Sequence, residues 1–300
     1  MAINIKNILN NLKKGISSLS DNDEKFEQLQ NLHRAITMYE GDDMLVSSKE
    51  IADRIRNRPE EEKFMSGYSD LDDIIGGFRK KQLVVISAAT KSGKTSFCID
   101  MTAHMQDANP VWLPLEESAE ELVQKFLDRK EEPPHFYAPQ KVPQSPLDWV
   151  ETKIIEATIK FKTKVVFIDH LHFIVPATHD RYDLAIGLAM RELKRIAREW
   201  DVLIFLIVHI KKARMDTPPS IEELRDSSFI AQESDMVIML FRLTKRVNGH
   251  IVIGNEVNVS VQTNRRNGNT GNVRMMFNGG KFIQMAKGTE GVTEEKSWNE

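Results

Sequence analysis

The stretch LVVISAATKSGKTSF, residues 83–97, decides the fold of this chain. Its apolar start, Leu83–Ile86, is typical of a fully buried strand. A loop of small and polar residues follows, and the tripeptide Gly-Lys-Thr at 93–95 then opens a pattern that is helical through about Met105. A strand, a small-residue loop and a helix with Gly-Lys-Thr at the junction are typical of a phosphate-binding P-loop.

The chemistry of a P-loop assigns roles to these residues. Backbone N–H groups of the loop and the N-terminus of the helix can hold a triphosphate. We expect Lys94 to reach the β- and γ-phosphates and the Thr95 hydroxyl to ligate Mg²⁺. An ordinary surface lysine on a strand–helix turn is the alternative, but the buried strand and the helix favour nucleotide binding. The predicted nucleotide-binding residues are Ala88, Ala89, Thr90, Lys91, Ser92, Gly93, Lys94, Thr95 and Ser96.

Composition bounds the class of protein. A chain of 300 residues with 41% hydrophobic content can form one sizeable domain and an appendage. The net charge of −3 excludes a protein that coats nucleic acid through bulk charge, so any such contact needs a local basic patch. The single cysteine, Cys98, excludes a disulfide framework and fits a reducing compartment. No apolar run approaches the length of a membrane span. Residues 1–20 lack acidic residues, as a transit peptide does, but they also lack arginine, and we expect a cytoplasmic protein.

Three regions follow from the pattern along the chain. Residues 1–60 are polar, with helices predicted at about 3–14, 22–39 and 48–58, the last with a capping box of Ser47 and Glu50. A segment this short buries a core of its own poorly. Two alternatives stay open for it: packing on the main domain or a neighbouring subunit, or a solvated arm. The main domain is predicted at 61–285, and the polar tail 286–300 is predicted to be disordered.

Strands and helices alternate through the main domain, and a run of hairpins follows them. This order predicts an α/β fold with a central, mainly parallel sheet and C-terminal β-hairpins. The strands are predicted at about 83–86, 111–115, 165–168, 202–208 and 236–241, then up to about 262 after an Asn-Gly turn at 248–249, with the last two joined at 278–280.

Polar residues stand where three of these strands end. Asp169 ends an apolar strand downstream of the P-loop, which is the Walker B arrangement for holding Mg²⁺ through water, with a helix N-cap as the alternative. Glu116 follows the second strand. His209 ends the fourth, and we interpret it as a candidate γ-phosphate sensor because ligands sit at the carboxyl ends of strands in such sheets. A lone histidine is more often structural.

Six blocks in order make residues 62–285 resemble the ATPase core of the DnaB-type replicative DNA helicases. The resemblance implies a RecA-like P-loop NTPase fold. The P-loop pattern usually begins with glycine where this chain has Ala88, and in that family alanine is normal at this position. The blocks are SGYSDLDDIIGG (66–77), AATKSGKT (88–95), PLEES (114–118), FIDHLHF (167–173), LRDSSFIAQESDMVIMLFR (224–242) and NRRNGNTG (264–271).

The resemblance adds further roles. It implies that Glu116 polarises the attacking water and that Arg266 is an arginine finger reaching the site of the next subunit. A solvated turn arginine is the alternative for Arg266. It also implies that Arg242 and Phe277 could sandwich the nucleotide base.

The chain departs from the family in places. The family often has lysine at the position of Asn264, so a second cationic finger would depend on Arg265. Bacterial members often have glutamine at the position of His209, whereas a histidine is similar to the phage helicase–primase and mitochondrial Twinkle branch. The N-terminal domain of the bacterial members is also much longer than residues 1–60 of this chain. The sequence shows no primase or zinc-binding segment, so we expect any priming to come from another chain.

Cationic residues in loops are the candidates for DNA contact. Such loops on an acidic chain suit tracking of a DNA backbone without sequence readout, although a charge run is more often a solvated face. The candidates are Arg181, Lys211, Lys212, Arg214 and Arg225.

These observations predict a ring-shaped, ATP-driven replicative helicase. It would use ATP or another NTP or dNTP with Mg²⁺, form a hexamer, translocate on single-stranded DNA and unwind forked DNA, 5′→3′ by resemblance. A separate primase, loader or polymerase would be its partner. One alternative is a RecA-like or KaiC-like DNA-binding ATPase without unwinding activity, and another is a degenerate P-loop scaffold.

Overall fold

The structure is a computed structural model that describes residues 25, 27, 29, 31, 44–89, 92–142, 147–175, 182–209, 219, 228–247 and 250–285. The chain divides into two compact units, Met1–Glu61 and Glu62–Glu300. The predicted helix at 3–14 and the tail 286–300 lie outside the described residues. Of the predicted helix 22–39, only residues 25, 27, 29 and 31 are described, and they are helical.

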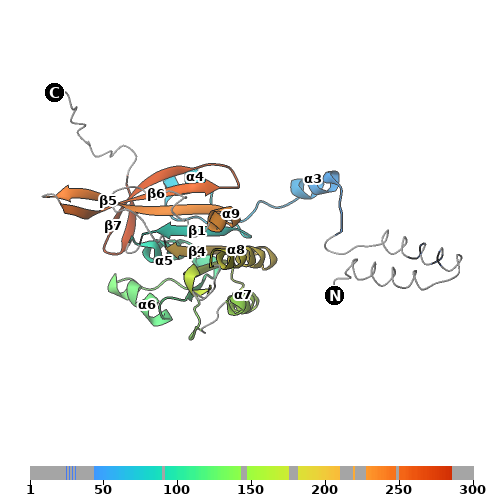
Figure 1. The fold of residues 1–300 in the computed structure, drawn as a ribbon, viewed down its shortest axis with the longest axis horizontal. Helices are drawn as coiled ribbons and strands as arrows, with labels where there is room; N and C mark the ends of the chain where they lie inside the picture. Colours follow the sequence, from blue (N-terminus) through green and yellow to red (C-terminus); the bar gives the residue numbers. More distant parts are fainter. Residues whose placement is uncertain are drawn as a thin grey trace, which may run out of the picture. The chain divides into compact units, whose positions relative to one another are not determined.

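The described helices and strands follow the order predicted from the sequence (Figure 1). The helices are α3 (Ser48–Arg56), α4 (Ser69–Ile75), α5 (Lys94–His104), α6 (Ala119–Asp128), α7 (Leu147–Phe161), α8 (Tyr182–Glu199) and α9 (Ser228–Glu233), with short 3₁₀ turns at Gln106–Ala108 and Leu171–Phe173. The strands are β1 (Leu83–Ala88), β2 (Val111–Pro114), β3 (Val165–Asp169), β4 (Leu203–His209), β5 (Met236–Val247), β6 (His250–Asn264), β7 (Gly271–Asn278) and β8 (Lys281–Gln284).

Helix α3 of the first unit begins with the predicted capping box. The Ser47 N–H donates to the Glu50 carboxylate at 2.8 Å, and the Glu50 N–H donates back to the Ser47 hydroxyl at 3.2 Å. These bonds lower the pKa of Glu50. None of the nine residues of α3 is buried. Its two isoleucines, Ile51 and Ile55, are 45% and 66% exposed, so their apolar stripe faces outward.

The second unit is built on an eight-stranded sheet with the order β2-β3-β4-β1-β5-β6-β7-β8. The strands from β2 to β5 pair in parallel, and β6, β7 and β8 continue the sheet in antiparallel pairs. The predicted α/β class with a mainly parallel centre and C-terminal hairpins is therefore confirmed.

Strands β5 and β6 run further than the sequence predicts. Their pairing continues to Val247 opposite His250, whereas the apolar pattern of β5 ends near Phe241. The reason is that ladder hydrogen bonds join backbones and need no apolar side chains. Residues 248 and 249 of the predicted Asn-Gly turn lie outside the described residues.

Two hydrophobic cores cover the two faces of the sheet. Alternate residues of β1 point to opposite faces, so Val84 and Ile86 enter one core while Leu83 and Val85 enter the other. The first core includes side chains from α4, α5 and α6, and the second includes side chains from α7 and α8. All six residues of β1 are buried. Burial of each large aliphatic side chain contributes about 1.5–3 kcal/mol to the free energy of folding. Strand β1 therefore holds the start of the loop that follows it in a fixed position.

The register of the strands shows which residues lie where β1 begins and which lie where it ends. Ala88, the last residue of β1, pairs with His209 of β4, so these two strands end at the same edge. Met236 pairs with Val84 near the start of β1 and also with Asn264, the last residue of β6. The turn between β6 and β7 therefore lies at the edge where β1 begins.

Candidate active site

The structure brings four predicted site residues together at the carboxyl edge of the parallel strands. Lys94 begins α5 after β1, Glu116 lies just beyond β2, Asp169 ends β3 and His209 ends β4. Register explains part of this arrangement, because Pro114 pairs with Asp169. In addition, the N–H groups of Leu115 and Glu116 both donate to the Asp169 carbonyl, at 2.6 and 3.1 Å.

Gly93 shapes the loop that precedes α5. Its φ of +90° is left-handed, and a Cβ on this residue would come within 3.0 Å of the Phe282 ring and 3.3 Å of the Phe277 ring. Only glycine fits such a position without strain. Ala88, Ala89, Ser92 and Ser96 of the predicted loop are described, whereas Thr90 and Lys91 lie outside the described residues.

Lys94 is only 4% exposed and is held by its own loop. Its Nζ donates to the carbonyl oxygens of Ala88 at 3.0 Å and of Ala89 at 3.2 Å. Burial lowers the pKa of Lys94 to about 8, against the opposing effect of Asp169 and Glu116. A buried ammonium with only two neutral acceptors is a strong attractor for an anion such as a phosphate oxygen.

Asp169 and Thr95 form the second part of the site. The Thr95 hydroxyl donates to Oδ2 of Asp169 at 2.8 Å, and Asp169 is only 2% exposed. Its other oxygen, Oδ1, is buried and has no hydrogen-bond partner among the described residues. Burial, together with the nearby carboxylates of Glu116 and Glu117, raises the pKa of Asp169 to about 6, against the lowering effect of the Thr95 hydrogen bond. An unpaired buried carboxylate oxygen beside a hydroxyl suits a hard divalent cation such as Mg²⁺.

Glu116 lies beside two histidines. Its Oε2 is 3.4 Å from Nε2 of His209 and 3.4 Å from Nε2 of His170. Burial lowers the pKa of His209, and the charge of Lys94 lowers it further. His170 was not among the predicted site residues. Its position directly after Asp169, where β3 ends, is the feature of the sequence that indicates a place in the site.

Glu117 is a second acid that the sequence analysis missed. Its side chain is 17% exposed and is paired with Lys125 of α6. It lies close enough to Asp169 to raise the pKa of that carboxyl. The capping box of α6 holds this segment, because the Ser118 N–H donates to Glu121 at 2.7 Å and the Glu121 N–H donates to Ser118 at 3.1 Å.

Arg242 and Phe277, the predicted base sandwich, lie in contact. The guanidinium carbon of Arg242 is 5.1 Å from the centroid of the Phe277 ring. Arg242 also donates to the Gly254 carbonyl, at 2.8 Å from one terminal nitrogen. Because Phe277 borders Gly93 as well, this stacked pair stands beside the P-loop.

Arg266 lies apart from Lys94, Glu116, Asp169 and His209 within the chain. It lies in the turn after β6, where its N–H donates to the Asn264 side chain at 3.2 Å. That turn is at the opposite edge of the sheet from Lys94. Its neighbour Arg265 donates from its side chain to the Gln232 carbonyl and from its N–H to the Asp235 carbonyl at 2.9 Å.

The predicted DNA contacts Arg181, Lys211, Lys212, Arg214 and Arg225 lie outside the described residues.

Over the part of the chain that is described, no helix combines the length and the apolar character needed to cross a lipid bilayer.

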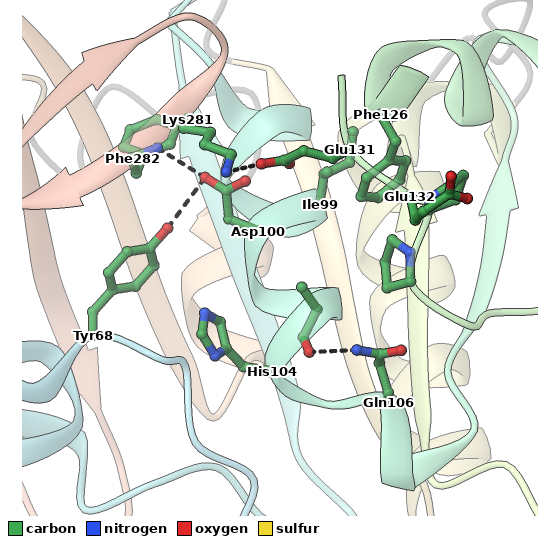
Figure 2. A pocket seen from close by; sticks show the side chains of 13 residues that line it. Tyr68, Ile99, Asp100, His104, Gln106, Phe126, Glu131, Glu132, Lys281 and Phe282 are labelled. Atoms are coloured by element: carbon green, nitrogen blue, oxygen red, sulfur yellow. Dashed lines mark hydrogen bonds and ion pairs between the residues drawn. The ribbon is translucent and has the colours of Figure 1, made fainter. Parts of the chain in front are cut away.

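A cavity of about 490 Å³ lies beside the P-loop helix, lined mainly by α5, by residues 131–134 after α6 and by the start of β8 (Figure 2). Asp100 of α5 is one of the residues that line it. Its carboxylate accepts hydrogen bonds from the Tyr68 hydroxyl at 3.3 Å, the Phe282 N–H at 2.8 Å and the Arg129 guanidinium at 2.6 Å. Asp100 therefore fixes Phe282, the ring that closes over Gly93.

Comparison with known proteins agrees with this geometry. The chain is 24% identical over 253 residues to a probable replicative DNA helicase of Trieres chinensis, which covers 71% of this chain and 54% of that protein. It is 26% identical over 231 residues to a probable plasmid replicative DNA helicase of Chlamydia trachomatis serovar L2, covering 66% of this chain and 51% of that protein. The chain thus spans about half the length of these curated relatives.

Solved structures show the same fold. One of them, an isolated ATPase domain, has a TM-score of 0.67 at 22% identity, covering 79% of this chain and 97% of that one. A DnaB-like replicative helicase, described with its primase interactions, has a TM-score of 0.66 at 20% identity, covering 94% and 77%.

The family model described as "DnaB-like helicase C terminal domain" matches residues 64–135 and 140–285. This match confirms the resemblance carried by the six sequence blocks, and it does not favour the RecA-like or KaiC-like alternative. The chain belongs to the family of DnaB-like helicase C-terminal domains.

Proposed function

We propose that this protein is a ring-shaped, NTP-driven replicative DNA helicase that translocates on single-stranded DNA and unwinds forked duplex. One observation carries the proposal: Lys94, Thr95, Glu116, Asp169 and His209 meet at one edge of the sheet. This set contains a group for each task of phosphoryl transfer to water, namely phosphate binding, cation binding and water positioning.

The first task is to bind a triphosphate. Lys94 would exchange the carbonyls of Ala88 and Ala89 for phosphate oxygens. The Thr95 hydroxyl and the Asp169 carboxylate would hold Mg²⁺, which neutralises phosphate charge when it is bound with ATP or another nucleoside triphosphate. Arg242 and Phe277, now 5.1 Å apart, would separate to receive the base between them.

The second task is to activate water. The Glu116 side chain is 48% exposed, in contrast to buried Asp169, so water can reach its carboxylate. We assign Glu116 to orient the water and accept its proton. His209 contacts Glu116, and its imidazole would register the state of the γ-phosphate.

The third task is to stabilise charge in the transition state. Arg266 is too far from Lys94 of its own chain, because the two residues follow opposite ends of the central strands. This placement supports a composite site, in which Arg266 enters the site of the neighbouring subunit. A closed ring gives every site such a neighbour, and we propose a hexamer.

The partners follow from the same proposal. The substrate would be single-stranded or forked DNA, contacted by the loops that carry Arg181, Lys211, Lys212, Arg214 and Arg225, with 5′→3′ translocation. Primase, a loader or a polymerase would be supplied as other chains in the cytoplasm. For residues 1–60, docking and a solvated arm both stay predictions.

Unwinding of a forked duplex tests the proposal. The wild-type protein is compared with Arg266→Ala and with Arg274→Ala, a matched control on β7 whose side chain is 52% exposed. We expect unwinding with NTP and Mg²⁺ by the wild type and by Arg274→Ala, and loss in Arg266→Ala. DNA-stimulated hydrolysis without unwinding, on forks of either tail polarity and from a preassembled ring, would overturn the helicase assignment.

A further inference from the structure

Glu116, His170 and His209 bring three metal-binding side chains together. Nε2 of each histidine lies 3.4 Å from the same oxygen, Oε2 of Glu116. One ligand atom from each of the three lies within 4.8 Å of the other two. We propose that this Glu-His-His cluster is a binding site for a transition-metal ion such as Zn²⁺, and that the bound ion inhibits NTP hydrolysis.

The two distances from Oε2 of Glu116 to the histidines suit ligands that share one ion. Good hydrogen bonds between nitrogen and oxygen span about 2.7–3.2 Å, so both 3.4 Å contacts are long. Ligands bound to zinc at about 2.0–2.2 Å in a tetrahedron are separated by about 3.3–3.6 Å. Both contacts of Glu116 fall in that range. The two imidazole rings, with centroids 4.4 Å apart, are inclined at 76° and so do not stack face to face.

The backbone prepares this arrangement. The three residues follow or end β2, β3 and β4, which are consecutive strands in the sheet. The Glu116 N–H donates to the Asp169 carbonyl, one residue before His170. Strands β3 and β4 are paired up to Asp169 opposite Ile207, two residues before His209. Backbone hydrogen bonds and strand pairing hold Glu116, Asp169 and His209, so little main-chain ordering is needed when an ion binds.

The ligand types select the ion. Two imidazoles and one carboxylate are a zinc set that leaves a fourth position for water. Mg²⁺ prefers oxygen ligands, so Mg²⁺ at Thr95 and Asp169 does not compete for this cluster. An ion can enter from solvent, since the side chains of Glu116, His209 and His170 are 48%, 24% and 10% exposed.

Inhibition follows from the role of Glu116, and this part rests on the proposed function. A carboxylate bound to a metal ion no longer accepts a proton from water at an ordinary rate, because the ion stabilises its ionised form. His209 is occupied by the same ion. Lys94 and Thr95 are not part of the cluster, so nucleotide binding persists while hydrolysis stops.

Metal binding is measured first, without reference to activity. The 300-residue chain without an affinity tag is titrated with Co²⁺. The visible absorption of Co²⁺ is intense when the ion is bound by four ligands, and it is weak for the aqueous ion. We expect one Co²⁺ per chain, displaced by Zn²⁺ but not by excess Mg²⁺. Loss of a single supporting group near a metal typically weakens binding about 10–100-fold, so loss of a direct ligand in His170→Ala should cost about 100-fold or more.

Two further variants keep this measurement decisive. Glu116→Gln tests the cluster through a half-exposed residue if His170→Ala folds poorly, and it should also weaken Co²⁺ binding. His135→Ala removes an exposed histidine outside the cluster and should bind as the wild type does. A wild-type spectrum equal to that of aqueous Co²⁺, or equal affinities of the wild type and both cluster variants, would overturn the metal site.

Hydrolysis is measured second. Zn²⁺ added at constant Mg²⁺ and NTP should inhibit the wild type over the range in which it displaces Co²⁺, with no change in nucleotide affinity. His135→Ala should respond in the same way. If Co²⁺ binds but Zn²⁺ leaves hydrolysis unchanged, the inhibitory role is overturned. If the wild type hydrolyses no NTP, the proposed function fails while the Co²⁺ result still decides the metal site.

Discussion

Lys94 and Arg266 lie at opposite edges of one sheet. Lys94 follows β1 where that strand ends, and Arg266 follows Asn264, whose partner Met236 lies beside Val84 near the start of β1. Under the proposed composite site, one chain would therefore carry halves of two different sites. This relationship makes a prediction about mixtures of variants.

Lys94→Ala and Arg266→Ala should each lose most NTP hydrolysis alone and recover part of it when mixed. In a mixed ring, an Arg266→Ala chain offers an intact Lys94 to an intact Arg266 on a neighbouring Lys94→Ala chain. Removal of an arginine finger typically costs about 10³-fold or more in rate, so recovery is easy to detect. Hydrolysis is followed at several mixing ratios. A mixture no more active than its components would show that Arg266 does not act between subunits.

Asp169→Asn should stabilise the protein at neutral pH in the absence of nucleotide and Mg²⁺. The folded-state pKa of Asp169 is about 6, above its usual value near 4, because burial opposes ionisation. The ionised group thus destabilises the fold at pH 7, by about 1–3 kcal/mol, and this cost disappears as the pH falls from about 6 towards 4. Thermal unfolding at pH 7.5 and at pH 5 checks the prediction. A stability gain that is the same at both pH values would contradict it.

Gly93→Ala should abolish tight nucleotide binding and lower stability. The new Cβ combines a positive φ with a 3.0 Å approach to Phe282. Gly279→Ala is the matched control, because its φ is +57° and no heavy atom lies within 4 Å of its built Cβ. The control should cost only the backbone strain, about 1 kcal/mol. Nucleotide titration and urea unfolding of both variants separate the two effects, and similar nucleotide affinities would contradict the steric role of Gly93.

Asp100→Ala should be strongly destabilising. It leaves Arg129, whose side chain is 6% exposed, without the acceptor at 2.6 Å. Breaking one side of a buried ion pair costs about 3–5 kcal/mol. The exposed acid Asp128→Ala serves as the control and should stay within about 0.5 kcal/mol of the wild type. Chemical denaturation measures both, and a cost for Asp100→Ala below that of the control would show that the pair is not structural.

Much of the fold could be predicted from local patterns. The strand before residue 88, the capping box of Ser47 and Glu50, and the acid at 169 each depend on a few neighbouring residues, and the structure shows them all. The length of β5 and β6 could not be predicted, because their outer part is held by backbone pairing rather than by apolar side chains.

The missed part of the candidate site has a different cause. His170 meets Glu116 and His209 only because three strands far apart in sequence end in register. No spacing along the chain encodes that register. A histidine after each of two strands was visible, but their convergence on one carboxylate oxygen needs coordinates.

The stacked pair of Arg242 and Phe277 has a consequence for the choice of nucleotide. In the proposed base site, this planar cation and this aromatic ring would hold a nucleobase by its faces, and every base offers such faces. Hydrogen-bonding edges, which distinguish adenine from thymine or guanine, are not read by stacking. A motor with this base site would hydrolyse whichever triphosphate its surroundings hold at the highest concentration, so the supply of nucleotides around it, rather than its own selectivity, would set the speed of unwinding.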